Sequence, residues 1–396
     1  MEESRPQSPP RIERLHVERY RALRSLDLVS LTPLVAFLGP NGSGKSTILD
    51  VFGFLAECFS SGLRQAWDKR GRFRELRTRG TEGPIVIELD YREGLGLPLL
   101  TYHLEIEEGT GGPFVAREWL SAAGSPSLLD FRSGAGVVLD GETAESHGEL
   151  TEERLSSPEA IAVNTLGQLY RYRRIGALRR FISDWHLSAL SPDDGRAAAE
   201  TGPQERLSAS GDNLPNVIEY LGEQHPEQLA TILAALVRCV PGLERVGTEL
   251  TPDGRLSLLV KDAPFADPIP ARFASEGTMK LLTYLTLLYD PDPPRLIGIE
   301  EPESHLHPRL LDELAEECRQ ASVRTQLLTS THSPFFVNGL RAEEVWALAR
   351  DEKGWTQARR ASEIRGISEF LAEGALLGDL WVEGHFDAEI ASRLAP

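Results

Sequence analysis

Residues 39–47 constrain the fold of this chain more than any other stretch. They are Gly39, Pro40, Asn41, Gly42, Ser43, Gly44, Lys45, Ser46 and Thr47, with the spacing G-x-x-x-x-G-K-[ST]. Apolar runs at 34–38 and 48–52 flank them, which predicts a strand, a glycine-rich loop and a helix. Backbone N–H groups of such a loop surround phosphate, and the helix N-terminus adds positive charge. We therefore expect a site for a nucleoside triphosphate.

Lys45 and Ser46 supply the polar side chains of this loop. A lysine at this position reaches the terminal phosphates, and the hydroxyl that follows offers a ligand to Mg²⁺. A glycine-rich turn that matches by chance is the alternative. The strand and helix expected on either side argue against it.

Paired carboxylates mark a second centre. The apolar run 296–299 predicts a short strand that ends in Glu300 and Glu301. Behind a phosphate loop, the first carboxylate is expected to hold Mg²⁺ and the second to orient and activate the attacking water. An exposed acidic turn is the alternative, but it would not need a buried strand in front of it.

His332 follows another expected strand, 323–328. A lone histidine at a strand end is usually structural or solvated, whereas its place one strand beyond the paired carboxylates favours a contact with the γ-phosphate. His305 and His307 have i, i+2 spacing, while a metal-binding helix would need i, i+4. We expect them in a loop at a subunit contact.

The remaining pattern predicts an α/β fold with additions to the core. Loose alternation over 12–28 suggests a hairpin around residues 20–21 that leads into the phosphate-loop strand. Glycine clusters separate short alternating runs at 85–89, 102–106, 114–119 and 137–139, which suggests an antiparallel β subdomain. Helical spacing covers about 157–235, and hairpins are expected over 246–260 and 345–361.

These patterns divide the chain into five expected segments. They are the N-terminal part of the ATPase core (1–60), the β subdomain (61–150), a helical lobe with a hairpin (151–268), the second part of the core (269–345) and a C-terminal hairpin and tail (346–396).

Composition limits the choice of partners. The net charge of −18 over 396 residues argues against a generally basic surface for nucleic acid. Local basic segments exist, however: 64–79 carries seven Lys and Arg, and 171–180 carries five arginines. A solvated charged surface and a local basic face both fit them. No apolar run approaches the ~18 residues of a membrane helix, so we expect no membrane partner and a cytoplasmic protein.

The motifs together resemble the ABC-type ATPases of the RecF/SMC and overcoming-lysogenization-defect (OLD) class. The resemblance is to the standalone AbiEii-like AAA ATPases in particular. It rests on residues 39–47, on Ser275-Glu-Gly-Thr278, on Glu300-Glu-Pro-Glu-Ser-His-Leu-His-Pro308 and on Thr331-His-Ser-Pro334, with 207–214 similar to a stretch that precedes the signature in these proteins. Transporter-type ABC ATPases carry a different first carboxylate and a fuller signature.

The resemblance implies a P-loop ATPase head, with a mixed ABC-type sheet around the phosphate loop, that dimerises head-to-tail around ATP. Each site would combine Lys45, Ser46, Glu300, Glu301 and His332 of one subunit with Ser275 and Gly277 of the other. Glu301 would be the catalytic carboxylate, Ser46 and Glu300 the Mg²⁺ partners and His332 the γ-phosphate switch. As a rival explanation, Ser275 is also a good helix N-cap. The family's glutamine loop has two weak candidates, Gln65 and Gln168.

Two functions remain open at this point. The first is a DNA-associated ATPase of repair or anti-phage defence, with double-stranded DNA as a partner. The second is an ATP-gated switch for a separate effector protein such as a nuclease or toxin. The second follows from the short stretch after His332, which is too small for the Toprim nuclease domain of OLD nucleases.

Overall fold

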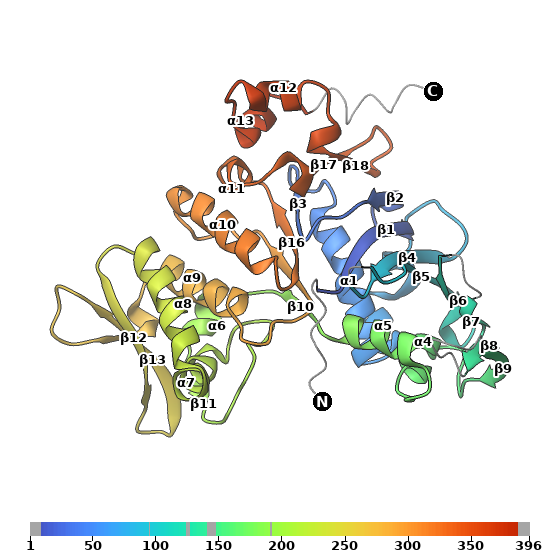
Figure 1. The fold of residues 1–396 in the computed structure, drawn as a ribbon, viewed down its shortest axis with the longest axis horizontal. Helices are drawn as coiled ribbons and strands as arrows, with labels where there is room; N and C mark the ends of the chain where they lie inside the picture. Colours follow the sequence, from blue (N-terminus) through green and yellow to red (C-terminus); the bar gives the residue numbers. More distant parts are fainter. Residues whose placement is uncertain (1–8, 95, 124–126, 141–147, 191, 387–396) are drawn as a thin grey trace.

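The computed structural model describes residues 9–94, 96–123, 127–140, 148–190 and 192–386 (Figure 1). Its central sheet has six strands in the order β10-β15-β16-β3-β17-β18. Their bounds are β3 (Leu34–Leu38), β10 (Trp185–Ser188), β15 (Leu296–Glu300), β16 (Gln326–Thr331), β17 (Val345–Arg350) and β18 (Thr356–Arg360). All neighbours pair in parallel except β17 and β18. The sheet is therefore mixed, as the sequence predicts.

The register of the central sheet brings three chain segments to one edge. Thr331 of β16 pairs with Leu38 of β3, and Ser330 pairs with Glu300 of β15. Parallel strands in this register end at the same level. Consequently the phosphate loop, the paired carboxylates and His332 all leave the sheet at one edge, which is where α/β proteins bind ligands.

A second sheet has eight strands, all antiparallel, in the order β2-β1-β4-β5-β6-β7-β8-β9. Their bounds are β1 (Arg11–Tyr20), β2 (Leu23–Val29), β4 (Ile85–Arg92), β5 (Leu100–Gly109), β6 (Gly112–Ala122), β7 (Ser127–Arg132), β8 (Ala135–Asp140) and β9 (Glu149–Arg154). Alternate side chains of β5 are buried, as expected for a sheet with one covered face. Helix α1 (Lys45–Ser60) shares its hydrophobic core with both large sheets.

The N-terminal hairpin forms where the sequence predicts it, but β1 pairs with β4 rather than with the phosphate-loop strand. The eight-stranded sheet thus joins residues 11–29, which the sequence assigns to the core, to residues 85–154. Around it lie α2 (Leu63–Lys69), α3 (Arg72–Leu76), α4 (Ala162–Leu166) and α5 (Arg173–Ser183).

A helical lobe lies on the other side of the central strands, at the left of Figure 1. Its elements share a second hydrophobic core with one face of the central sheet. They are α6 (Pro192–Arg196), α7 (Leu214–Gln224), α8 (Pro226–Cys239), α9 (Glu276–Leu288), the 3-10 turn η1 (Ala271–Phe273) and the strands β11 (Ala199–Glu200), β12 (Leu243–Leu250), β13 (Arg255–Asp262) and β14 (Ile269–Pro270). The predicted hairpin over 246–260 is β12 and β13.

Two local expectations are wrong. The stretch expected to be helical contains β10, which pairs with β15 in the central sheet, and Leu169 and Tyr170 lie exposed between α4 and α5. β16 begins at Gln326 rather than at Val323, because the chain turns after α10 (Leu311–Ala321) and leaves Val323 exposed.

The C-terminal part completes the central sheet and then adds short helices. The hairpin predicted around Gly354 is β17 and β18. Turns η2 (Pro308–Leu310), η3 (Ala342–Glu344) and η4 (Ala361–Glu363) and helices α11 (Pro334–Asn338), α12 (Ile367–Ala372) and α13 (Leu377–Val382) account for the remaining regular structure. Among the described residues, no helix is both long and apolar enough to cross a membrane.

Candidate nucleotide site

The phosphate loop has the backbone conformation that its glycines allow. Gly42 and Gly44 have φ values of 81° and 110°, which residues with a Cβ rarely adopt. A Cβ added to Gly44 would lie 2.2 Å from Oγ1 of Thr356. The tip of the loop, at Pro40 and Asn41, is exposed. Glycine is therefore required here both by conformation and by the close approach of β18.

Thr356, the first residue of β18, supports the loop from behind. Its buried hydroxyl donates a hydrogen bond to the backbone carbonyl of Ser43 at 2.9 Å. The two residues are 313 positions apart in the sequence. Sequence reasoning missed Thr356, since no local pattern connects it to the loop.

Lys45 lies over the loop. Its Nζ donates hydrogen bonds to the carbonyl oxygens of Gly39, at 2.7 Å, and Pro40, at 3.1 Å. Burial lowers the pKa of Lys45, and the carboxylates of Glu301, Glu303 and Glu300 oppose that shift. The ammonium group is thus close to the loop and within the field of the acidic residues that follow β15.

Ser46 and Glu300 meet at the start of α1. Partial burial raises the pKa of Glu300, the neighbouring carboxylates of Glu301 and Asp50 raise it further, and a hydrogen bond with Ser46 lowers it. A hydroxyl and a carboxylate beside further negative charge form an oxygen donor set that suits Mg²⁺. These two residues therefore fit the metal that the sequence predicts. Thr47, half-buried, follows them in the first turn of α1.

Glu301 and His332 come together between neighbouring strands. Glu301 adopts a φ of 44°, and its N–H donates to the carbonyl of Ser330 at 2.9 Å. Its carboxylate oxygen Oε1 lies 3.4 Å from Nδ1 of His332, and both side chains remain partly exposed. Strain of this kind in a residue other than glycine is concentrated at functional sites. The carboxylate and the imidazole face the solvent beside the loop.

Glu303 holds the backbone and side chain of His332 and the hydroxyl of Thr331. Its Oε1 accepts hydrogen bonds from the N–H of His332 at 2.8 Å and the hydroxyl of Thr331 at 2.9 Å, and lies 3.2 Å from Nδ1 of His332. The other oxygen, Oε2, is buried without a hydrogen-bond partner. Sequence reasoning did not assign Glu303 a role. The third carboxylate in Glu-Glu-Pro-Glu was the available signal.

The signature residues lie at the N-terminus of α9, beside the loop that follows the paired carboxylates. Ser275 caps α9 by accepting a hydrogen bond from the N–H of Thr278 at 3.0 Å. A Cβ on Gly277 would lie 2.9 Å from the carbonyl oxygen of His305, so packing within the chain already requires glycine there. Among the described residues, no hydrogen bond or ion pair joins Ser275 or Gly277 to the phosphate loop. One chain therefore brings together all the predicted site residues except these two.

The two glutamine candidates and the hairpin turn at residues 20–21 lie on other elements than the strands of the central sheet that carry the site. Gln65 is exposed on α2, and Gln168 donates to the carbonyl of Asn164. Tyr20 is buried and donates to Asp50 at 2.6 Å, while Arg21 lies 2.9 Å from the same carboxylate.

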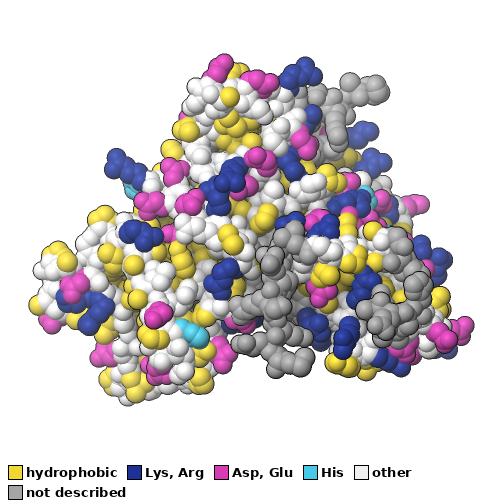
Figure 2. Space-filling model, in the orientation of Figure 1, with side chains coloured by type: hydrophobic (Ala, Val, Ile, Leu, Met, Phe, Trp, Pro, Cys, Tyr) yellow, Lys and Arg dark blue, Asp and Glu magenta, His cyan; other side chains and the backbone are white. Residues whose placement is uncertain are grey.

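Many cations of the two arginine-rich segments are paired with acids. Arg70 is largely buried and pairs with Asp50 and Glu57, and Arg171 pairs with Asp140 and Glu153. On the face drawn in Figure 2, Lys and Arg are interspersed with Asp and Glu. The most exposed cations are Lys69, Arg72, Arg74 and Arg79 of the first segment, with 70–93% of each side chain accessible.

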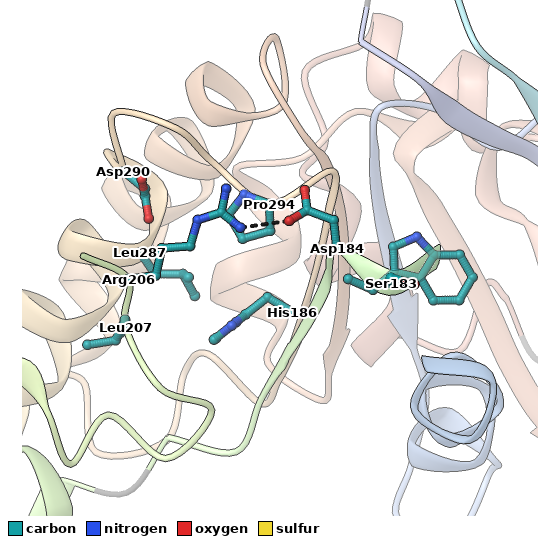
Figure 3. A pocket seen from close by; sticks show the side chains of 9 residues that line it. Ser183, Asp184, His186, Arg206, Leu207, Leu287, Asp290 and Pro294 are labelled. Atoms are coloured by element: carbon teal, nitrogen blue, oxygen red, sulfur yellow. Dashed lines mark hydrogen bonds and ion pairs between the residues drawn. The ribbon is translucent and has the colours of Figure 1, made fainter. Parts of the chain in front are cut away.

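A cavity of about 150 Å³ lies at the opposite edge of the central sheet (Figure 3). Arg206 lines it and pairs with Asp184 at 2.7 Å. Burial, with the nearby charge of Arg206, lowers the pKa of His186 to about 4, and burial raises the pKa of Asp290 to about 6. The cavity begins where β10 and β15 start, so it is separate from the phosphate loop.

The fold and the site together define a P-loop ATPase with an ABC-type head, which binds ATP. The chain belongs to the family described as "AAA domain, putative AbiEii toxin, Type IV TA system", whose model matches residues 34–338.

Several known proteins are similar to this chain in sequence or in fold. An OLD nuclease of Thermus scotoductus (strain ATCC 700910 / SA-01) is 28% identical over 381 residues, which cover 86% of this chain and 62% of the relative. The chain thus spans less than two thirds of that relative's length. An Smc head domain derived from Pyrococcus furiosus, solved with an extended coiled coil and bound to the C-terminal domain of ScpA, has a TM-score of 0.53 at 13% identity, covering 92% of this chain and all of that one. The SMC head domain from Thermotoga maritima has a TM-score of 0.44 at 15% identity, covering 88% and 98%.

Proposed function

We propose that the chain is a Mg²⁺-dependent ATP hydrolase that dimerises head-to-tail around ATP. The observation that carries the proposal is the division of the predicted site. Lys45, Glu301 and His332 converge at one edge of the central sheet, while Ser275 and Gly277 stand apart on α9. A second copy would bring its α9 to the exposed phosphate loop. Its Ser275 hydroxyl and helix N-terminus suit an incoming γ-phosphate.

Each residue then has a distinct task. The loop Gly39–Thr47 would hold the phosphates through its N–H groups, and Lys45 would exchange its bonds to loop carbonyls for bonds to the terminal phosphates. Ser46 and Glu300 would hold Mg²⁺, which when bound would screen charge on the phosphates. Glu301 would orient and activate the attacking water, and His332 would contact the γ-phosphate. ATP would then favour the dimer, and hydrolysis would release it.

Glu301→Gln tests this part directly. The amide cannot accept a proton from water, so turnover should fall by at least about a hundredfold, as expected when a general base is lost. ATP should then accumulate in the site and hold the dimer together. Steady-state turnover and mass in solution, each with and without ATP and Mg²⁺, measure both effects. A variant with wild-type turnover, or one that stays monomeric with ATP, would refute the assignment.

The exposed cations of α3 and of the residues just after it favour DNA as a partner of the dimer. We propose that Arg72, Arg74 and Arg79 contact the phosphate backbone of double-stranded DNA, in repair or anti-phage defence. These exposed guanidinium groups pair with acids at the surface. Because such surface ion pairs contribute little to stability, the arginines can exchange these acids for DNA phosphates. DNA should then raise ATP turnover, and the effect should weaken steeply with salt.

Arg74→Ala with Arg79→Ala should reduce the stimulation by DNA and leave turnover without DNA unchanged. Arg255→Ala, which removes an exposed arginine of β13 in the helical lobe, is the matched control. The alternative function, an ATP-gated switch for a separate effector protein, is favoured by the net charge of −18. Turnover that DNA does not change, together with an ATP-dependent protein partner of Glu301→Gln, would select it.

A further inference from the structure

The signature turn contains a carboxylate, Glu276, at the position between Ser275 and Gly277. A carboxylate in the first turn stabilises its own helix, because it faces the positive end of the helix dipole. The same carboxylate opposes a second anion at that helix end. If α9 is to meet the triphosphate of a partner subunit, the charge of Glu276 has to be neutralised or held aside.

Two groups hold this carboxylate from opposite sides. Nδ1 of His305 lies 2.9 Å from Oε2 of Glu276, and NH1 of Arg196 lies 3.6 Å from Oε1. Arg196 comes from α6 of the helical lobe, and His305 comes from the loop after the paired carboxylates. The side chains of Glu276 and His305 are about half exposed, whereas that of Arg196 is only 18% exposed.

Further contacts make this arrangement rigid. Arg196 also donates a hydrogen bond to the carbonyl of Ala274, directly before the signature serine. His305 has a φ of 66°, and its carbonyl oxygen packs against Gly277. The backbone on both sides of Glu276 is thus fixed by the same two residues that contact its carboxylate.

We propose that Arg196 and His305 are positioning residues that hold Glu276 away from the path of the partner's γ-phosphate, Arg196 through its charge and His305 through a hydrogen bond. The inference rests on the proposed ATP-bound dimer. It explains how a signature with an acidic residue can still accept a phosphate: two donors satisfy the carboxylate within its own chain. Without them, Glu276 would stand uncompensated at the helix end that receives ATP.

A double-mutant cycle in the Glu301→Gln background tests the proposal. His305→Gly removes the imidazole and suits the positive φ. It should raise the ATP concentration for half-maximal dimerisation by about three- to tenfold, the range expected for one unpaired charge near a helix terminus. Glu276→Gln should abolish that effect, so the double variant should dimerise at the ATP concentration of Glu276→Gln alone. His385→Gln, at the exposed His385–Glu383 pair, is the control and should change nothing.

The outcomes separate the two levels of the proposal. Glu301→Gln that does not dimerise with ATP would overturn the proposed function itself. A normal ATP-bound dimer with no effect of His305→Gly would overturn only the role of His305 and Arg196. A loss that persists in the Glu276→Gln background would do the same, because the loop would then act through its backbone. Thermal unfolding of each variant identifies any that fails to fold. If His305→Gly does not fold, Arg196→Gln, which removes the charge beside Glu276, replaces it in the cycle.

Discussion

At the scale of single residues, Glu303 holds the end of β16 and the residue that follows it. It accepts bonds from both Thr331 and His332, and it is itself almost buried. In Glu303→Gln the charge is lost while the shape is kept. Charge-assisted hydrogen bonds contribute about 1.5–3 kcal/mol, so turnover should fall by about ten- to a hundredfold with a smaller change in KM. Steady-state kinetics over a range of ATP concentrations measures turnover at saturation and KM separately.

Glu343→Gln is the matched control for that experiment, since Glu343 is an exposed carboxylate in η3, just before β17. Glu343→Gln should leave both turnover at saturation and KM unchanged. A Glu303→Gln enzyme with raised KM and normal turnover at saturation would mean that Glu303 acts in nucleotide binding rather than in positioning His332.

The residues that sequence alone could predict are those that lie next to one another in the chain. The phosphate loop and the pair Glu300 and Glu301 are contiguous, and strand and helix signals surround them. Thr356 could not be predicted, because its role arises from the pairing of β18 with β17 beside the loop. Residue roles that depend on tertiary contact need the fold.

At the scale of elements, a buried carboxyl group joins β6 to α4. Glu118 accepts hydrogen bonds from the N–H groups of Ala162 and Val163 and from the hydroxyl of Tyr102. Burial raises the pKa of Glu118 to about 7, against the effect of these bonds. Glu118 therefore binds its proton more tightly in the folded state than in the unfolded chain, where its pKa is near 4.5.

The sign of the pH dependence follows from that difference. Between about pH 4.5 and pH 7 the folded state holds more protons at this site, so the free energy of unfolding falls as pH rises. The slope from this group reaches at most about 1.4 kcal/mol per pH unit. Glu118→Gln should remove this slope and lower overall stability by about 1–3 kcal/mol, since one N–H loses its acceptor.

Denaturant unfolding at a series of pH values, with Glu149→Gln on the exposed strand β9 as control, measures both quantities. If the free energies of unfolding of the wild type and of Glu118→Gln changed with pH in parallel, a titration of Glu118 in this range would be contradicted. A difference that grows as pH falls below 7 is the expected result.

Elements were predictable where the apolar pattern is strong. β3, β4, β5 and β15 have buried side chains in the spacing that the sequence shows. β9 has an exposed, charged sequence, and β10 is only four residues long inside a region of helical spacing, so neither carries a signal of its own. Their strand pairing is set by the neighbouring strand.

At the scale of the whole molecule, the side chain of Gln326 helps to connect the two large sheets. The buried amide of Gln326, at the start of β16, accepts a hydrogen bond from the N–H of Ile12 at 2.8 Å and donates to its carbonyl at 2.9 Å. Gln326→Leu would leave both backbone groups of β1 without partners. Each unsatisfied buried group costs about 1–3 kcal/mol, so the free energy of unfolding should fall by about 2–5 kcal/mol.

Urea unfolding of Gln326→Leu, followed by fluorescence and circular dichroism, measures this loss. Gln320→Leu, at an exposed glutamine of α10, should be nearly neutral. Unfolding curves that separate between the two probes would show that the sheets have lost their common transition. Equal stability of the two variants would refute the role of Gln326.

The pairing of strands also fixes an order of events during synthesis. The eight-stranded sheet is built from residues 11–154, almost entirely between strands that are neighbours in sequence, so it can assemble while the ribosome is still translating the rest. β3 has to wait, because both of its partners, β16 and β17, are made about three hundred residues later. Until then the emerging chain carries an unpaired apolar strand with its phosphate loop incomplete. A truncated or stalled chain therefore contains the loop sequence without the ATPase, and its exposed β3 makes it a substrate for chaperones.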